Sequence, residues 1–421
     1  MKKILLYILL LTTIAACTDK IDLTPAERPD ARLAAALSDY EQKLTGAENG
    51  WDGYLFPAGG GGATFHFQFS NNNRVVSYAD INNNSATTPM ESSYRLKATQ
   101  LPSLYFDTYT YLHMLADPDP QVLGGSQGIG FSSDFEFSIL SASEDTIKLQ
   151  GNLNNSNLIL VRAKEANASS HVARAYAINE ALRKTAMFTY YYNVLTLSSK
   201  QYQIAINPDV QTISFYSNNN GFQRFTTAYA ASATGLILHS PFVDGDTRVA
   251  EFHDITVSDS QNRIILTTGS TPGTTANVAT PLAIDTDAPN RMTTSGYYFI
   301  SDTGFTMAGV TNAHDLTSIP GFNGLIYYPQ YSSGYDILYF PFNTDQAFLP
   351  AFTNQINANG RITFRYRGDF NDTLPVEPYD TNIFNTITQF TTSGGYYVYQ
   401  TGESSYDLVS STNGRNWIRF R

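Results

Sequence analysis

The sequence predicts a mainly β, α+β fold in which antiparallel meander sheets follow a few helices. Apolar and polar residues alternate along many short stretches, as Phe65, Phe67 and Phe69 do against His66 and Gln68. This alternation is the period of a half-buried strand. Turn-forming residues recur about every ten residues between such stretches. The chain is rich in tyrosine (28) and phenylalanine (26) and low in charge (15%), which suits strands joined by turns.

One amphipathic helix is expected to precede the first sheet. Leu33, Leu37, Tyr40 and Leu44 recur at three- and four-residue spacings, which gives the helix one apolar face. Trp51 follows the helix and is expected to anchor it on the sheet. After the strand that carries Phe65, further strands are predicted at residues 93–98, 103–109, 134–140, 146–150 and 158–163.

The same pattern then restarts. A second helical stretch, residues 169–188, leads into strands where Tyr202 and Ile204 alternate as Phe65 and Phe67 do in the first unit. The segment from Glu251-Phe252 onward likewise corresponds to the segment from Glu136-Phe137 onward. We interpret this order as two diverged copies of one helix-plus-meander unit.

The remaining chain is expected to be a linker and a C-terminal β-rich domain. The linker is rich in Thr, Pro, Ala and Asp with few large apolar residues. The predicted division is a signal peptide (1–16), a tether (17–29), repeat 1 (30–164), repeat 2 (165–270), the linker (271–291) and the C-terminal domain (292–421).

The first seventeen residues have the layout of a secretory signal. A basic start is followed by an apolar run, residues 4–14, and by small residues before Cys17. The run is too short to span a bilayer. Cys17 is the only cysteine in the chain, and its position is typical of a lipobox, where the cysteine is acylated. The alternative is a plain signal with an unrelated cysteine. We expect a lipid-anchored protein.

The composition argues against two classes of binding partner. The net charge is −11 and no basic run occurs, which argues against nucleic acid. It also argues against electrostatic binding to an anionic membrane surface, so the lipid remains the expected membrane contact. No cofactor is expected.

No motif assigns a catalytic or metal-binding residue. None of the six histidines pairs with another at i,i+4 spacing, so a zinc hydrolase is not indicated. The glycine run at residues 59–62 lacks the Lys-Ser/Thr of a phosphate-binding loop and is interpreted as a flexible hairpin entry.

Two acidic stretches leave alternatives open. Asp134 and Glu136 are two apart on a predicted strand and could supply the carboxylate pair of a glycosidase. We favour a solvated sheet face, with Phe135 and Phe137 on the other side. The Asp-Pro-Asp-Pro stretch at residues 117–120 could offer oxygens to calcium, but it lacks the 12-residue calcium loop, and a stiff loop is favoured.

Tyrosines near turns are the remaining candidates for ligand binding. Tyrosine suits surfaces that bind sugars or peptides because it combines an apolar ring with a polar hydroxyl. In a strand, however, every second tyrosine faces the core, and cross-strand packing is the interpretation we favour. The candidates are Tyr190, Tyr191, Tyr192, Tyr327, Tyr328, Tyr331 and Tyr335.

Several local motifs occur along the chain. They are the lipobox with Cys17, residues 29–32, Gly50-Trp51 with Tyr54, the glycine-rich entry to Phe65, and residues 92–96, 104–109, 117–120 and 133–137. Together they resemble a known family, the Bacteroidota lipoprotein domain-of-unknown-function family 4302. Members tend to be encoded beside SusC/SusD-like importers, so the resemblance implies an accessory role at the outer membrane. It implies a lipoprotein of that membrane that faces the cell surface or otherwise the periplasm. Only Cys17 transfers from the family, as the lipidated residue.

The sequence therefore favours a non-enzymatic lipoprotein that binds a glycan or peptide nutrient, or a SusC/SusD-like transporter, for uptake. The alternative is a surface hydrolase of glycosidase type that acts on the same nutrient. A third interpretation is a purely structural envelope protein.

Overall fold

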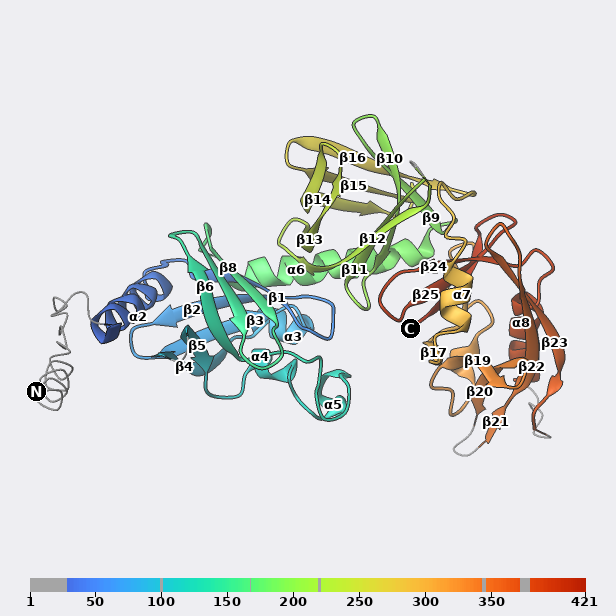
Figure 1. The fold of residues 1–421 in the computed structure, drawn as a ribbon, viewed down its shortest axis with the longest axis horizontal. Helices are drawn as coiled ribbons and strands as arrows, with labels where there is room; N and C mark the ends of the chain where they lie inside the picture. The colour runs from blue at the N-terminus through green and yellow to red at the C-terminus, as the bar shows by residue number, and fades with distance from the viewer. Residues whose placement is uncertain (1–28, 99–100, 167, 219–220, 343–345, 372–378) are drawn as a thin grey trace, which may run out of the picture.

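The chain forms three successive β units, with one long helix between the first two (Figure 1). The structure is a computed structural model that describes residues 29–421 except 99–100, 167, 219–220, 343–345 and 372–378. The predicted signal and Cys17 lie outside the described residues. The predicted fold class, mostly antiparallel β with few helices, is confirmed. No helix in the described part is long and apolar enough to cross a membrane.

The first unit is a closed barrel of eight antiparallel strands in which β1 pairs with β8. Phe65, Phe67 and Phe69 are buried in its core from β2, and their successive ring centroids are 5.4 and 6.0 Å apart. An eight-stranded barrel has an interior that side chains can fill, and Phe106 and Phe137 complete the filling. The strands are β1 Trp51–Phe56, β2 Ala63–Ser70, β3 Arg74–Ala79, β4 Met90–Ala98, β5 Pro102–Phe106, β6 Glu136–Ala142, β7 Thr146–Gly151 and β8 Asn157–Arg162.

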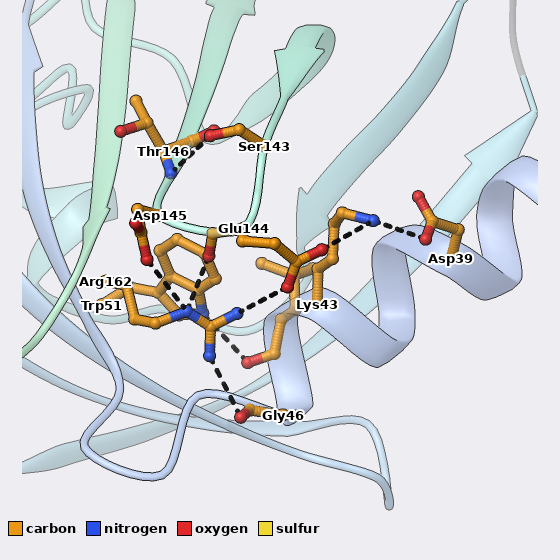
Figure 2. A network of polar contacts seen from close by, with 10 residues as sticks. Asp39, Lys43, Gly46, Trp51, Ser143, Glu144, Asp145, Thr146 and Arg162 are labelled. Carbon is orange, nitrogen blue, oxygen red and sulfur yellow. Dashed lines mark hydrogen bonds and ion pairs between the residues drawn. The ribbon is translucent and has the colours of Figure 1, made fainter.

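Trp51 anchors the first helix on this barrel, as predicted (Figure 2). Its indole N–H donates to the carbonyl of Leu44 at 3.0 Å, and the Arg162 guanidinium lies 4.9 Å from its ring centroid. The ion pairs of Lys43 drawn in the same figure have exposed carboxylate partners and add little stability, so the buried ring provides the anchor. The helices of this unit are α2 Pro29–Thr45, α3 Asn83–Thr87, α4 Tyr111–Met114 and α5 Pro120–Leu123.

The second unit repeats the same plan, with a helix followed by a closed eight-stranded barrel. Tyr202 and Ile204 are buried in its second strand, where Phe65 stands in the first barrel. Phe252 is buried in its sixth strand, where Phe137 stands in the first. The elements are α6 Ala168–Arg183, the 3₁₀ turn η2 Lys184–Met187, β9 Tyr192–Leu197, β10 Lys200–Asn207, β11 Thr212–Ser217, β12 Gln223–Ala231, β13 Leu236–Asp244, β14 Thr247–Ser258, β15 Arg263–Thr268 and β16 Thr271–Val278.

Residues 271–278, which we expected within a linker, are instead the strand β16 that closes the second barrel by pairing with β9 and β15. Its two buried positions are the small residues Gly273 and Thr275. A Cβ at Gly273 would lie 2.8 Å from a terminal methyl group of Leu197, so a larger residue would require the neighbouring leucine side chains to move. The strand therefore lacks the large apolar residues that mark the others.

The third unit is a ten-stranded antiparallel sheet with two helices. Helix α8 buries Ile383 and Ile387, and its Phe390 stacks on Phe364 with ring centroids 4.1 Å apart. The sheet follows the order β17-β19-β20-β22-β23-β24-β25-β26-β18, and β21 pairs with β20. The elements are α7 Ala288–Thr293, β17 Phe299–Ser301, β18 Phe305–Met307, η3 Leu316–Ser318, β19 Leu325–Ser332, β20 Tyr335–Phe342, β21 Gln346–Phe348, β22 Pro350–Ile356, β23 Arg361–Asp369, α8 Asp380–Phe390, β24 Tyr396–Gln400, β25 Tyr406–Ser410 and β26 Asn416–Phe420.

Helix α6 lies between the two barrels (Figure 1). It contacts α3, β2 and β3 of the first barrel and β12 and β14 of the second. Val172, Ala175 and Leu182 are fully buried along it. The barrels also touch directly, because Tyr54 and Phe56 on the outer face of β1 form an apolar cluster with β12. The relative position of the barrels is thus fixed by apolar packing.

A largely buried Asp-His-His group joins α6 to the first barrel. The Asp52 carboxylate lies 2.8 Å from Nδ1 of His66 and 3.5 Å from Nδ1 of His171, which is on α6. Burial lowers the pKa of His171, the charges of His66 and Arg174 lower it further, and Asp52 opposes them. The folded state therefore favours neutral His171 more than the unfolded chain does.

This pKa shift predicts acid sensitivity. Because the pKa of His171 is lower in the folded than in the unfolded chain, its stabilising contribution is complete above the unfolded pKa and is lost as pH falls through the folded pKa. We expect the free energy of unfolding, measured by urea titration, to fall on the order of 1 kcal/mol more in the wild type than in His171→Gln between about pH 7 and about pH 5.

The partly exposed His253 provides the control, since hydrogen bonds to Gly269 and Asp254 raise its pKa. The variant His253→Gln should therefore lose as much free energy of unfolding between about pH 7 and about pH 5 as the wild type does. A wild-type and a His171→Gln profile of equal slope would contradict the assignment.

Candidate functional site

A continuous strip of exposed and partly exposed aromatic rings lies on the C-terminal sheet around the β19–β20 hairpin. The ring centroids of Tyr298 and Tyr328 are 5.0 Å apart, and those of Tyr328 and Tyr331 are 5.9 Å apart. Phe370, just after β23, contacts Tyr331 at 5.4 Å and Tyr335 at 6.1 Å. Tyr331 is 50% exposed and Tyr335 40%. We call these five residues the aromatic strip.

An irregularity in β19 produces the strip. The β19–β20 register shifts between Tyr328 and Ser332, and Gln330 has a positive φ of 53°. Such a bulge changes the direction in which the following side chains point. The buried carboxylate of Asp336 holds it, because Oδ1 accepts the Gln330 N–H at 2.8 Å and Oδ2 accepts the Tyr327 hydroxyl at 2.9 Å.

Tyr327 supports the strip without belonging to it. Its ring is fully buried in the core of the C-terminal sheet, one residue before the partly exposed Tyr328. Burial and the nearby Asp336 raise the pKa of Tyr327 well above its usual value, so its hydroxyl stays a donor to that carboxylate. This is the alternation of a strand, with one tyrosine in the core and the next at the surface.

Chemically, the strip can bind a flat ligand without a charged anchor. Burial raises the pKa of Tyr328, which remains neutral and can donate or accept a hydrogen bond. Neighbouring rings are tilted or edge-on, from 39° to 85° between planes, so they form a stepped surface. Tyrosine rings pack on apolar faces while their hydroxyls bind polar rims, as a pyranose ring requires.

The other tyrosine group lies in an interface between domains. Tyr191 and Tyr192 are buried with Tyr216 of the second barrel against Tyr399 and Trp417 of the C-terminal sheet. The Tyr216 hydroxyl donates to the carbonyl of Gln400 at 2.8 Å across this interface. Tyr191 and Tyr192 are therefore closed to a ligand from solvent.

Tyr190, next to this pair, is half-buried. Its backbone is held by Asn277, whose side chain accepts the Tyr190 N–H at 2.9 Å and donates to the Tyr190 carbonyl at 2.7 Å. It contributes no exposed ring to the aromatic strip.

The structure corrects the expected solvated face at Asp134. Asp134 precedes β6 and is buried, and its carboxylate accepts backbone N–H groups of Leu153, Asn154 and Ser156 at 2.9 to 3.0 Å. It therefore fixes the turn between β7 and β8. Glu136 begins β6 and is half-buried.

The two phenylalanines beside these acids do not share one face either. Phe137 is in the barrel core, whereas Phe135 is 38% exposed and stacks on His113 with ring centroids 4.6 Å apart. The carboxylate pair of a glycosidase is not formed at this place.

The acidic Pro-rich stretch has a local structural role. The Asp119 carboxylate accepts the Gln121 N–H at 2.9 Å and caps α5, with Pro120 at its first position. Asp117 accepts the Asp119 N–H at 3.0 Å and the hydroxyl of Tyr109. Among the described residues, no cluster of three or more histidine, cysteine or acidic side chains could hold a metal ion.

The model of a protein family described as a domain of unknown function, DUF4302, matches residues 25–257, which is more than half of the chain. The chain belongs to this family. The match includes the whole first barrel and ends inside β14 of the second, so the aromatic strip lies outside the matched residues. No curated protein matches the chain.

Solved structures add no functional information beyond the family. The DNA polymerase sliding clamp from Pseudomonas aeruginosa aligns over 91% of this chain and 96% of its own at 9% identity and a TM-score of 0.18. A protein of unknown function from the DUF3598 family of Nostoc punctiforme aligns over 74% and 93%, at 9% identity and a TM-score of 0.15. TM-scores this low carry no argument about fold or function.

The geometry predicts different stability effects for the two kinds of tyrosine. We expect the double variant Tyr331→Ser, Tyr335→Ser to change the free energy of unfolding by less than about 1 kcal/mol, because both rings are largely exposed. Tyr327→Ala should cost about 3–5 kcal/mol, since it removes a buried ring. Urea titrations measure both. A double variant as unstable as Tyr327→Ala would show that the strip serves packing.

Proposed function

We propose that the chain is an outer-membrane lipoprotein, anchored through Cys17, that binds a glycan as a non-enzymatic component of a SusC/SusD-like nutrient uptake system. The aromatic strip is the observation that carries the binding part of this proposal. Monomeric proteins rarely expose contiguous apolar surface without a partner or ligand to cover it.

The anchor part rests on the N-terminal sequence. The apolar run at residues 4–14, the small residues after it and the lone Cys17 together are typical of a lipoprotein signal. Several acyl chains hold a folded body stably on a membrane. Resemblance to lipoproteins of Bacteroidota, whose genes often neighbour SusC/SusD-like importers, supports the uptake role.

The chemistry of the strip favours a glycan over a peptide. Four of its five residues are tyrosines, and none is charged. A pyranose ring offers an apolar face and a rim of hydroxyls, which match tyrosine rings and their hydroxyl groups. An extended peptide would instead require an open strand edge or pockets for alternate side chains.

A surface hydrolase acting on the same nutrient is the second candidate. Its sequence support was the pair Asp134 and Glu136, and Asp134 is occupied by three backbone N–H groups. A binding role therefore accounts for more of the observed geometry than a hydrolytic one.

Two measurements on the full chain test the proposal. Tagged protein is purified from its native cells in mild detergent, and co-eluting proteins are identified by mass spectrometry. We expect a TonB-dependent transporter and its partner lipoprotein in stoichiometric amounts. In parallel, native gels containing the polysaccharides on which the cells grow should retard the wild type, because binding slows migration.

The variants decide where the glycan binds. Tyr331→Ser with Tyr335→Ser should abolish retardation, whereas Tyr109→Ser removes a comparably exposed tyrosine from the first unit and should leave it unchanged. Retardation that survives in the double variant would refute the strip as the site. If the protein binds peptides but no polysaccharide, the proposed ligand is a peptide and not a glycan. If the protein elutes without a transporter, the proposed role in uptake is refuted.

A further inference from the structure

A cavity of about 580 Å³ lies where the two barrels and α6 meet. Its walls come from the first barrel near residues 57–63 and Asp80, from α6, from the β10–β11 turn and β12 of the second barrel, and from residues 402–405 of the C-terminal sheet. Sites for small ligands are commonly cavities of about this size between domains. This cavity involves none of the residues of the aromatic strip.

The glycine run at residues 59–62 forms one wall. Gly62 approaches the second barrel so closely that a Cβ would lie 2.4 Å from the Tyr229 carbonyl oxygen, and its N–H donates to Oε1 of Gln211 at 3.3 Å. Gly60 and Gly61 have positive φ of 98° and 73°. The run is therefore one of the contacts between the barrels, and only its peptide groups line the cavity.

Asp80 lies in the cavity wall just after β3 and is 6% exposed. Its Oδ1 accepts the Thr64 N–H at 2.7 Å, while Oδ2 has no hydrogen-bond partner among the described residues. Burial raises the pKa of Asp80 to about 7. A buried carboxylate oxygen without a hydrogen-bond donor is costly, and a bound donor to Oδ2 would reduce that cost.

Asn179 presents a second unused acceptor from α6. It is 5% exposed and lines the same cavity, and its Oδ1 is without a partner in the part of the chain that the structure describes. Buried side-chain acceptors normally have a partner. Two buried acceptors on different elements, Oδ2 of Asp80 and Oδ1 of Asn179, are therefore without a hydrogen-bond donor among the described residues.

The charge of the wall favours a cation. The lining residues include four acids, Asp80, Glu180, Asp209 and Glu403, and one base, Arg183. Arg183 is already paired, because its Nε donates to Glu180 at 3.0 Å and its Nη1 contacts Asp209. A positively charged donor would balance this excess.

Part of the wall is apolar. Ile81, Leu115, Leu123, Phe131 and Tyr176 contribute to it from the first unit and from α6. We propose that the cavity binds a small ligand with a primary ammonium group on an apolar body, the ammonium lying beside Asp80 and Asn179. The apolar body then covers the aliphatic and aromatic wall.

A matched pair of probes tests this proposal by calorimetric titration of the full chain in detergent. Leucinamide carries an ammonium group on an aliphatic body, and N-acetylleucinamide is its neutral counterpart. We expect saturable one-to-one binding of leucinamide at about pH 7 and at least about tenfold weaker binding of the acetylated probe. Equal binding of both probes, or binding of neither, would overturn the proposal.

Protonation gives a second readout. A cation beside Asp80 favours its ionised form, so leucinamide should release protons from a carboxyl whose pKa is about 7. The binding heat at about pH 6 should therefore differ between buffers of different ionisation enthalpy. Asp80→Asn should abolish this difference and weaken binding at least about tenfold, whereas Asp246→Asn, an exposed acid outside the cavity, should change neither.

The variant Asn179→Leu provides a second test of the site in case Asp80→Asn does not fold. The substitution replaces an acceptor that has no partner with an apolar side chain of similar size, so the fold should tolerate it. It should weaken leucinamide binding by about tenfold while wild-type retardation by polysaccharide persists. Unchanged leucinamide affinity in Asn179→Leu would contradict the proposed position of the ammonium group.

Discussion

The burial of α6 between the two barrels is the contact on which the arrangement of the first two units depends. Val172, Ala175 and Leu182 are fully buried along the helix, which contacts both barrels. Ala175 is small enough for close approach, and apolar burial of this kind supplies most of the free energy that joins domains. At the same junction the glycine run meets β12, and α6 supplies one wall of the cavity at Asp80.

Closure of the barrels determines where ligands can bind. In the first barrel, phenylalanines from β2, β5 and β6 fill the interior, and in the second Phe215 stacks on Phe242 with ring centroids 4.3 Å apart. Eight-stranded barrels can hold one small ligand only when side chains leave room. Here the candidate sites lie outside the barrels, on the C-terminal sheet and at the junction, where elements distant in sequence meet.

The local fold could be predicted from the sequence because strand alternation and helix periodicity are local signals. Phe65 and Tyr202 indicated equivalent strands in the two repeats, and Trp51 indicated the helix anchor. Closure could not be predicted, because the pairing of β1 with β8 joins residues more than a hundred positions apart. The strand β16 was missed because its inward positions, Gly273 and Thr275, are small.

The candidate sites were predictable only in part. Tyr328, Tyr331 and Tyr335 were candidates from their density near a turn, but Phe370 joins them only through tertiary folding. Asp80 and Asn179 carry no sequence signal at all, because an acid after a strand and an amide in a helix are ordinary. Their importance comes from burial of a side-chain oxygen without a hydrogen-bond partner, which depends on how the end of β3 and α6 pack in the folded chain.

The most direct test of this account is amide hydrogen exchange of α6 in the native full chain, read by mass spectrometry. If the helix is buried between the barrels, its amides beyond the first turn should exchange as slowly as those of β2 and β12. The amides of all three elements should lose their protection together when the protein unfolds. Rapid exchange of α6 while both barrels remain protected would show that the barrels are independent, and it would contradict the rigid junction on which the cavity depends.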